Sequence, residues 1–288
     1  MRSRTPVAKL IAGSIAIGAI ASSALLYAQL PFREYPSMEY DSGSGLPPGW
    51  DVPAEFVVGR LMYPPQSGGG RGGCRSGGMG GGGGRWEQGG TSWTVDYPLG
   101  DRTFAAILKR LTVVDVRPVE QPVNLDDGDD VFNWPFLIVG MPSSWDLTDA
   151  QALNLREYLL RGGFLLADSF FGTEEWDCFM ASMIRVFPNR PIVELADEHA
   201  LFNVVYDFSE RHQIHNWRTL SRGGYRADGS EPHWRAILDD DGRIMVAMSF
   251  NNDMGDSWQH ADDPTYPQED SHMGLRLGVN HVIYTLTH

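Results

Sequence analysis

The sequence predicts an α/β protein with a doubly wound, mostly parallel sheet that carries helices on both faces. Short apolar segments alternate with amphipathic ones along most of the chain, which is typical of parallel strands joined by helices. Residues 161–172 read RGGFLLADSFFG, where two glycines end a helical pattern, a strand follows, and polar residues stand where the strand stops. Hydrophobic residues make up 42% of the 288 residues, which is enough for a packed core.

The predicted elements follow one another in chain order. Strands are predicted from apolar or β-branched runs over residues 55–63, 112–116, 135–140, 164–168 and 191–195. Helices are predicted from apolar spacing and capping residues after Asp101, over residues 148–160, from Thr173, and over residues 273–286. A capping box at Thr148 and Gln151 marks the start of the second helix. Asp241 and Gly242 predict a hairpin between strands 234–238 and 243–250.

The first 32 residues predict an export signal or a membrane anchor. Three basic residues lie before a stretch without charged side chains from Leu10 to Phe32. As a helix this stretch would span about 34 Å, enough for the hydrocarbon core of a bilayer. A cleaved signal peptide and a retained transmembrane helix both fit. The basic flank predicts that the remaining chain is exported, to the periplasmic face of the inner membrane, the periplasm or the medium.

The rest of the chain predicts one domain after a linker. Residues 33–54 are rich in Pro, Gly and Ser and predict a linker, and the domain is expected over residues 55–288. A glycine tract at about residues 66–90 lacks the ending of a phosphate-binding loop and predicts a flexible insertion. Cys74 and Cys178 have no second cysteine at metal-ligand spacing, which excludes a cysteine zinc site. Whether the two cysteines form a disulfide stays open.

Polar residues at the predicted strand ends are the candidates for chemistry, because the carboxyl ends of parallel strands meet at one edge of the sheet. The candidate catalytic residues are Asp168, Ser169, Glu175 and His199. The candidate ligand-binding residues are Asp96, Tyr97, Asn251, Asp253, Asp256 and Trp258. The candidate ligands of a divalent metal are Asp168, Asp253 and Asp256.

Each candidate also has a structural interpretation. Asp253 and Asp256 lie in an N-x-D-x-G-D segment that resembles a calcium loop but is too short, so they also fit as partners of turn amides. Ser169 lacks the flanking glycines of a G-x-S-x-G elbow and also fits as a loop cap. Glu175 also fits a helix start, and a lone His199 is more often structural than catalytic.

Seven phrases, in order along the chain, carry a resemblance to a known family. They read FVVGRLMY, WTVDYPLGD, PFLIVG, LREYLLRGGFLLADSFFG, MIRVFP, FNNDMGDSW and LGVNHVIYTLTH. Over about residues 55–288 the chain resembles the bacterial domain-of-unknown-function 4159 family. The resemblance implies a flavodoxin-like fold of the class I glutamine amidotransferase type and an exported or membrane-anchored protein. The family usually has two adjacent aspartates after the GGF strand, and Ser169 stands at the second position here.

The residues at the turn after strand 164–168 exclude one enzymatic function. An amidotransferase needs a cysteine at the turn after this strand, and residues 167–170 contain none. The net charge of −14 argues against a nucleic-acid partner. We therefore predict a non-catalytic module of the cell envelope without a cofactor, which binds a protein or a glycan. The alternative is a carboxylate-based hydrolase, assisted by a divalent metal, that acts on an envelope substrate.

Overall fold

The computed structural model describes residues 30–39, 45–66 and 85–288. The chain divides into two units, residues 1–32 and 33–288, and the second contains all the helices and strands of the described residues. The predicted export segment lies almost entirely outside the described residues, as do most of the glycine tract and Cys74. Within the described ranges, no helix has both the length and the apolar character needed to span a bilayer.

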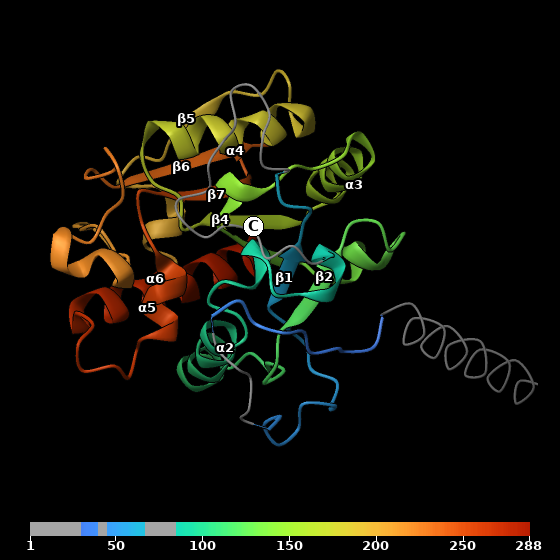
Figure 1. The fold of residues 1–288 in the computed structure, drawn as a ribbon, viewed down its shortest axis with the longest axis horizontal. Helices are drawn as coiled ribbons and strands as arrows, with labels where there is room; N and C mark the ends of the chain where they lie inside the picture. Colours follow the sequence, from blue (N-terminus) through green and yellow to red (C-terminus); the bar gives the residue numbers. More distant parts are fainter. Residues whose placement is uncertain (1–29, 40–44, 67–84) are drawn as a thin grey trace, which may run out of the picture. The chain divides into compact units, whose positions relative to one another are not determined.

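A seven-stranded sheet forms the centre of this unit, in the order β2-β1-β3-β4-β7-β6-β5 (Figure 1). Its strands are β1 (Gly59–Met62), β2 (Gln121–Asn124), β3 (Phe136–Gly140), β4 (Phe164–Asp168), β5 (Ile192–Glu194), β6 (His233–Leu238) and β7 (Ile244–Phe250). The first five strands in this order are parallel, and β6 and β5 are antiparallel to their neighbours. The predicted mostly parallel sheet and the hairpin of β6 and β7 are confirmed.

Helices cover both faces of the sheet, as predicted (Figure 1). One face carries α3 (Asp149–Leu160) and α4 (Gly172–Val186), and the other carries α2 (Leu99–Leu111), α5 (Met254–Gln259) and α6 (Gln268–Thr287). The strand order turns back at β1, because β2 and β3 lie on opposite sides of it. In such sheets ligands bind beyond the carboxyl ends of the strands near this reversal.

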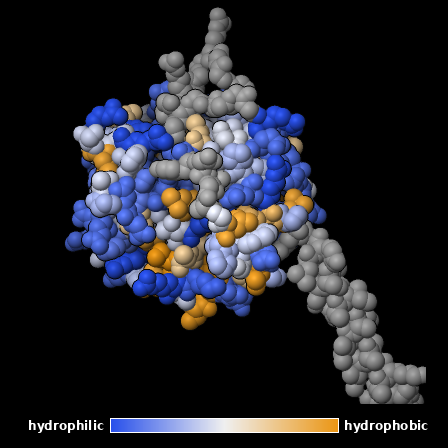
Figure 2. Space-filling view, turned by 60° about the horizontal axis from the view of Figure 1, so that its bottom comes forward, coloured by the Kyte–Doolittle hydropathy of each residue, from blue (hydrophilic) through white to orange (hydrophobic). Residues whose placement is uncertain are grey.

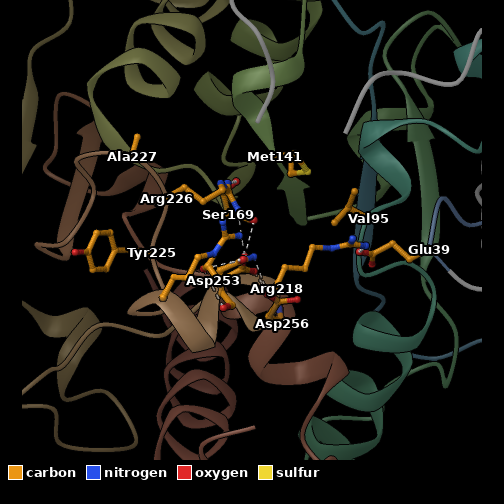
Figure 3. Close-up of a pocket in the computed structure, with 13 residues that line it drawn as sticks. Glu39, Val95, Met141, Ser169, Arg218, Tyr225, Arg226, Ala227, Asp253 and Asp256 are labelled. Atoms are coloured by element: carbon orange, nitrogen blue, oxygen red, sulfur yellow. Dashed lines mark hydrogen bonds and ion pairs between the residues drawn. The ribbon is translucent and has the colours of Figure 1, made fainter. Parts of the chain in front are cut away.

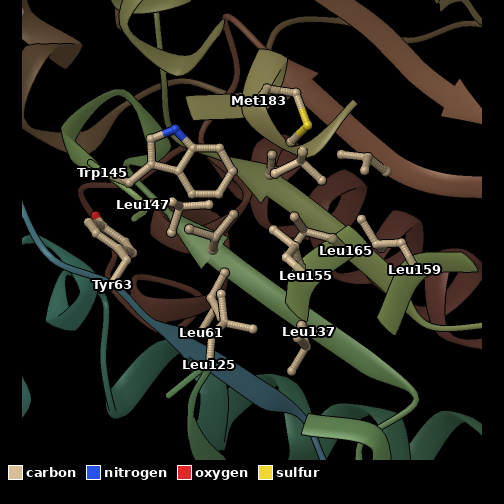
Figure 4. Close-up of a cluster of buried hydrophobic side chains, with 14 of the residues drawn as sticks. Leu61, Tyr63, Leu125, Leu137, Trp145, Leu147, Leu155, Leu159, Leu165 and Met183 are labelled. Atoms are coloured by element: carbon tan, nitrogen blue, oxygen red, sulfur yellow. The ribbon is translucent and has the colours of Figure 1, made fainter. Parts of the chain in front are cut away.

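Side-chain alternation along the strands divides the core into two layers. Leu137 and Val139 of β3 point into the layer under α3 and α4, whereas Phe136 and Ile138 point into the layer under α2, α5 and α6. All four side chains are buried, as expected for a strand covered on both faces. Figure 4 shows the first layer, in which Leu155 and Met183 from the helices meet the leucines of the strands.

Two predicted elements differ from the structure. Residues 112–116 form no strand: only Val116 makes an isolated bridge, and Val113 is fully exposed. The edge strand is instead β2, which holds Pro122, and an edge position tolerates a residue that cannot donate a ladder hydrogen bond. Helix α4 begins at Gly172 without a side-chain cap from its N-cap residue, because that residue is Phe171. Thr173, the predicted cap, lies inside the helix, where its hydroxyl and amide donate to Asp228.

The first part of the predicted linker lies against the domain. Glu34 pairs with Arg102 of α2 at 2.6 Å, and Glu39 pairs with Arg218 at 2.6 Å. The backbone amide of Tyr35 donates to the Tyr97 hydroxyl at 3.0 Å. Residues 33–39 therefore belong to the folded unit and place one acidic side chain, Glu39, near the carboxyl edge of the sheet.

The surface of this unit is predominantly polar. Figure 2 shows mainly hydrophilic residues over the face in view, with hydrophobic ones in small separate groups. The most exposed large apolar side chains, such as Val113, Leu153 and Ile184, come from different elements. Scattered apolar residues of this kind are normal on a protein surface and indicate no binding face by themselves.

Helix α6 packs closely enough on its neighbours to give a stability prediction. A Cβ at Gly278 would lie 2.7 Å from the Phe104 ring and 3.0 Å from the Trp258 ring, and these two rings stack at 4.2 Å. We expect Gly278→Ala to lower the free energy of unfolding by about 1–3 kcal/mol, because overpacking outweighs the helix propensity gained. Denaturant unfolding measures the change. The matched control is Gly45→Ala, whose Cβ meets nothing within 4 Å; equal effects of the two would contradict the packing argument.

Candidate functional site

A pocket with a volume of about 520 Å³ lies beyond the carboxyl ends of three parallel strands. Met141 follows β3, Ser169 follows β4, and Asp253 stands three residues after β7. Figure 3 shows these residues around the pocket, with Tyr225 and Glu39 on opposite sides of it. The volume lies within the range of small-molecule sites, and the position is where doubly wound sheets bind ligands.

The backbone around the pocket is held in an unfavourable conformation. Asp96, Met141, Ser169 and Asn251 have φ angles of 60°, 47°, 61° and 62°, a region that non-glycine residues rarely adopt. Three of them are the first residues after β3, β4 and β7. Each residue in such a conformation lowers the stability of the fold by about 1–3 kcal/mol, and such residues cluster at functional sites. The strain therefore coincides with the edge of the sheet at which the pocket lies.

Asp253 caps α5 and also faces the pocket. One of its carboxylate oxygens accepts the backbone amide of Asp256 at 3.1 Å. The other accepts the Ser169 hydroxyl at 2.7 Å and the Asn216 side-chain amide at 2.9 Å. The segment after β7 thus forms the short helix α5 rather than a loop, and its capping residue is one of the predicted candidates.

Three aspartates form what we call the carboxylate floor: Asp96, Asp253 and Asp256, of which Asp253 and Asp256 line the pocket. One carboxylate oxygen from each lies within 4.8 Å of the other two, and all three residues are buried. Asp256 accepts hydrogen bonds from the Asn216 side chain at 2.9 Å and from the Trp217 amide at 2.7 Å. Oδ1 of Asp96 has no hydrogen-bond partner among the described residues.

Burial and like charge act together on the carboxylate floor. Burial raises the pKa of Asp96 well above its ordinary value, and the nearby Asp256 and Asp253 raise it further. Burial likewise raises the pKa of Asp256, with Asp253 as the next cause. Carboxylates so close together in a poorly solvated place cannot all stay ionised unless a positive charge joins them. The carboxylate floor therefore favours protons or a cation.

Asp168 lies at the same edge but binds the start of α5. Its carboxylate accepts the amides of Met254 at 3.0 Å and Gly255 at 2.7 Å, together with the hydroxyl of Ser249. Burial raises the pKa of Asp168 to about 7, and the charge of Asp253 adds to the rise. Two of the three predicted metal ligands, Asp253 and Asp256, lie close together in the structure. The third carboxylate of their cluster is Asp96 and not the predicted Asp168.

A basic wall stands over the carboxylate floor; it consists of Arg218, Arg222 and Arg226. Arg226 binds Glu175 through two nitrogens at 2.9 and 3.0 Å, and its third nitrogen is 3.9 Å from Asp253. Arg222 is exposed and has no ion pair or hydrogen bond within the described part of the chain. Glu175 is therefore the counter-ion of a pocket arginine, whereas the Arg222 side chain lines the pocket without a counter-ion among the described residues.

The other predicted site residues have structural partners. His199 accepts the Leu201 amide at 3.2 Å as the cap of a short helix and does not line the pocket. The Trp258 indole donates to the Gly274 carbonyl at 3.0 Å within the core. The Asn251 side chain accepts the Gly172 amide at 2.8 Å. Tyr97 is buried. Cys178 is buried on α4 and is disulfide-bonded, and Cys74 lies outside the described residues.

The basic wall and Asn216 were missed in the sequence. They lie in an irregular, polar stretch, residues 209–230, whose spacing matches neither a helix nor a strand. The one available signal is that arginines recur every four residues at 218, 222 and 226. Glu39 gave no signal, because its role depends on the contact of residues 33–39 with the domain.

The structure is an α/β domain with a pocket, lined largely by polar residues, at the carboxyl ends of its strands. The family model "Domain of unknown function (DUF4159)" matches residues 84–286, and the chain belongs to this family. No curated protein matches the chain. The family membership predicted from the seven phrases is thereby confirmed.

Proposed function

We propose that the domain is a binding module that takes a small anionic ligand in the pocket over the carboxylate floor. The observation that carries the proposal is the basic wall, and above all Arg222, which lines the pocket and whose exposed side chain has no ion pair or hydrogen bond among the described residues. Arginine presents donors in a fork that matches a carboxylate or a phosphate. The pocket volume of about 520 Å³ suits a ligand of the size of a sugar acid or a sugar phosphate.

The ordered residues around the pocket support binding. Arg226 is held by Glu175 and by the Ser169 carbonyl, which accepts at 3.0 Å, so its position is fixed before a ligand arrives. Arg218 is held by Glu39 at 2.6 Å. Preorganised donors lower the entropic cost of binding. We further propose that the module acts outside the cytoplasm, as the basic flank and uncharged segment of the N-terminus predict.

The test compares two sugars that differ in charge. We expect glucuronic acid to raise the unfolding midpoint of the full chain in a saturable way, and glucose to leave it unchanged, because only the former carries a carboxylate. Arg222→Gln should weaken glucuronate binding about tenfold, since one charge-assisted hydrogen bond is lost. Arg110→Gln, an exposed arginine of α2 away from the pocket, is the matched control. Equal shifts with both sugars, or unchanged affinity in Arg222→Gln, would contradict the proposal.

A hydrolase is the second candidate, and Ser169 is the observation that favours it. This residue is strained at φ 61° at the end of β4, and its hydroxyl donates to Asp253 at 2.7 Å inside the pocket. A serine on a strained strand-to-helix turn beside a proton acceptor is the arrangement of an activated nucleophile. Turnover of a sugar ester that is abolished in Ser169→Ala would favour this function, whereas binding without turnover would favour the module.

A further inference from the structure

We propose that the carboxylate floor binds one divalent cation of the oxygen-preferring class, such as Mg²⁺, Mn²⁺ or Ca²⁺. The inference deepens the proposed function and rests on it in one respect: the ligand's anionic group would complete the coordination of the ion. Cation binding itself is measured without any ligand. Failure of one proposal is therefore distinguishable from failure of the other.

The three aspartates of the carboxylate floor converge from different parts of the chain. Asp253 and Asp256 come from the start of α5, whereas Asp96 comes from the loop before α2, so the fold brings together residues that are far apart in the sequence. Their carboxylate oxygens lie within 4.8 Å of one another, a spacing that one ion can bridge after a small adjustment. All three residues are at most 5% exposed.

Asp96 supplies the independent second observation. This residue is 2% exposed, and its Oδ1 atom has no hydrogen-bond partner in the described structure. A buried carboxylate oxygen without a partner carries a large desolvation cost. The backbone also holds Asp96 in place, since its φ is 60° and its amide donates to Glu39 at 3.0 Å. A buried carboxylate with one oxygen that lacks a hydrogen-bond partner, beside two other carboxylates, is the arrangement that a cation would satisfy.

Gly255 makes this approach of Asp96 sterically possible. A Cβ at position 255 would lie 2.9 Å from the Asp96 carboxyl carbon and would overlap the carboxylate. The glycine in N-x-D-x-G-D therefore serves contact with a residue that is remote in the sequence. In a calcium loop, by contrast, the glycine permits a sharp turn of the backbone.

The donors determine the class of ion. All three are carboxylate oxygens, which suit Mg²⁺, Mn²⁺ and Ca²⁺, and no cysteine lies among the residues that line the pocket. Three protein oxygens leave at least three positions of an octahedral ion for water or for an anionic ligand. The basic wall over the carboxylate floor is placed to hold that ligand.

The experiment measures Mn²⁺ binding to the full chain after EDTA treatment, by the loss of the free-ion electron paramagnetic resonance signal. We expect one saturable site per chain and a rise of about 4 °C in the unfolding midpoint at excess Mn²⁺. Asp96→Asn should weaken Mn²⁺ binding at least tenfold, because the amide cannot supply the negative charge that the carboxylate gives to the ion. Asp256→Asn should weaken binding to the same extent.

The control is Asp130→Asn, which alters a buried aspartate that accepts the Trp134 indole at 3.0 Å and does not line the pocket. Its Mn²⁺ affinity should equal that of the parent chain. Absence of saturable binding by the parent chain would overturn the inference, as would equal affinity in the parent and Asp96→Asn. If Asp96→Asn did not fold, Asp256→Asn and the parent chain would decide between these outcomes.

Discussion

Arg60→Ala is expected to lower the free energy of unfolding by about 3–5 kcal/mol. Arg60 lies on β1 with 1% exposure and binds Asp101 of α2 through two nitrogens at 2.7 and 3.0 Å. Asp101 is completely buried, and burial raises its pKa while the Arg60 charge opposes the rise. Removal of the arginine leaves this carboxylate in the core without its hydrogen-bonded counter-ion. Urea unfolding at neutral pH measures the loss.

A double variant separates the loss of the counter-charge from the loss of volume. Arg60→Met combined with Asp101→Leu removes both charges and keeps apolar bulk, so it should recover most of the stability lost in Arg60→Ala. If the double variant were as unstable as Arg60→Ala, the stability lost in Arg60→Ala would come from lost packing and not from the missing counter-charge. A loss below about 1 kcal/mol in Arg60→Ala, the size typical of an exposed pair, would contradict the importance of the pair.

The second large effect is a pH dependence that Asp168 causes. Its pKa is about 7 in the folded protein and close to 3.8 in the unfolded chain, so the folded protein binds more protons between these values. The stability that this proton provides is complete below the lower value and is lost as the pH rises through the upper one. The loss is on the order of 4 kcal/mol between pH 4 and pH 8.

The measurement is the difference in unfolding free energy between the parent chain and Asp168→Asn from pH 4 to pH 8 in EDTA. His281 has a pKa lowered to about 4 by burial and acts in the opposite direction, but it contributes equally to both proteins. The asparagine also disturbs hydrogen bonds to α5, which adds a constant offset and leaves the slope unchanged. The variant should become relatively more stable as the pH rises. A flat difference would mean that the amides of Met254 and Gly255 keep Asp168 ionised throughout.

The parts of the fold with strong local signals could be predicted from sequence. The apolar runs of β3 and β4, the capping box of Thr148 and the Asp241–Gly242 turn each determine their own element. The edge strand β2 was not predictable, because it contains Pro122 and its pairing depends on β1 rather than on its own composition. Helix α5 was missed because it has only six residues and is anchored by Asp168 from another strand.

The site was predictable only in part, for a similar reason. Strand-end residues such as Asp253 can be located, because the carboxyl ends of parallel strands share an edge. The sequence predicted Asp168 as the third carboxylate of this cluster, but the structure has Asp96 there. Asp168 instead accepts a backbone amide of α5, and this difference depends on three-dimensional packing. Arg222 and Glu39 lie in segments whose apolar residues follow neither a helix nor a strand pattern, and only the folded chain brings them to the pocket.

The most direct test of the carboxylate floor as a ligand site is an anomalous difference map from crystals of the protein grown with Mn²⁺. We expect one strong peak within coordination distance of oxygens from Asp96, Asp253 and Asp256, and no comparable peak at Asp168. Peaks confined to other carboxylates, or an empty carboxylate floor at saturating Mn²⁺, would contradict the assignment. The aspartates would then serve the structure of α5 and its surroundings.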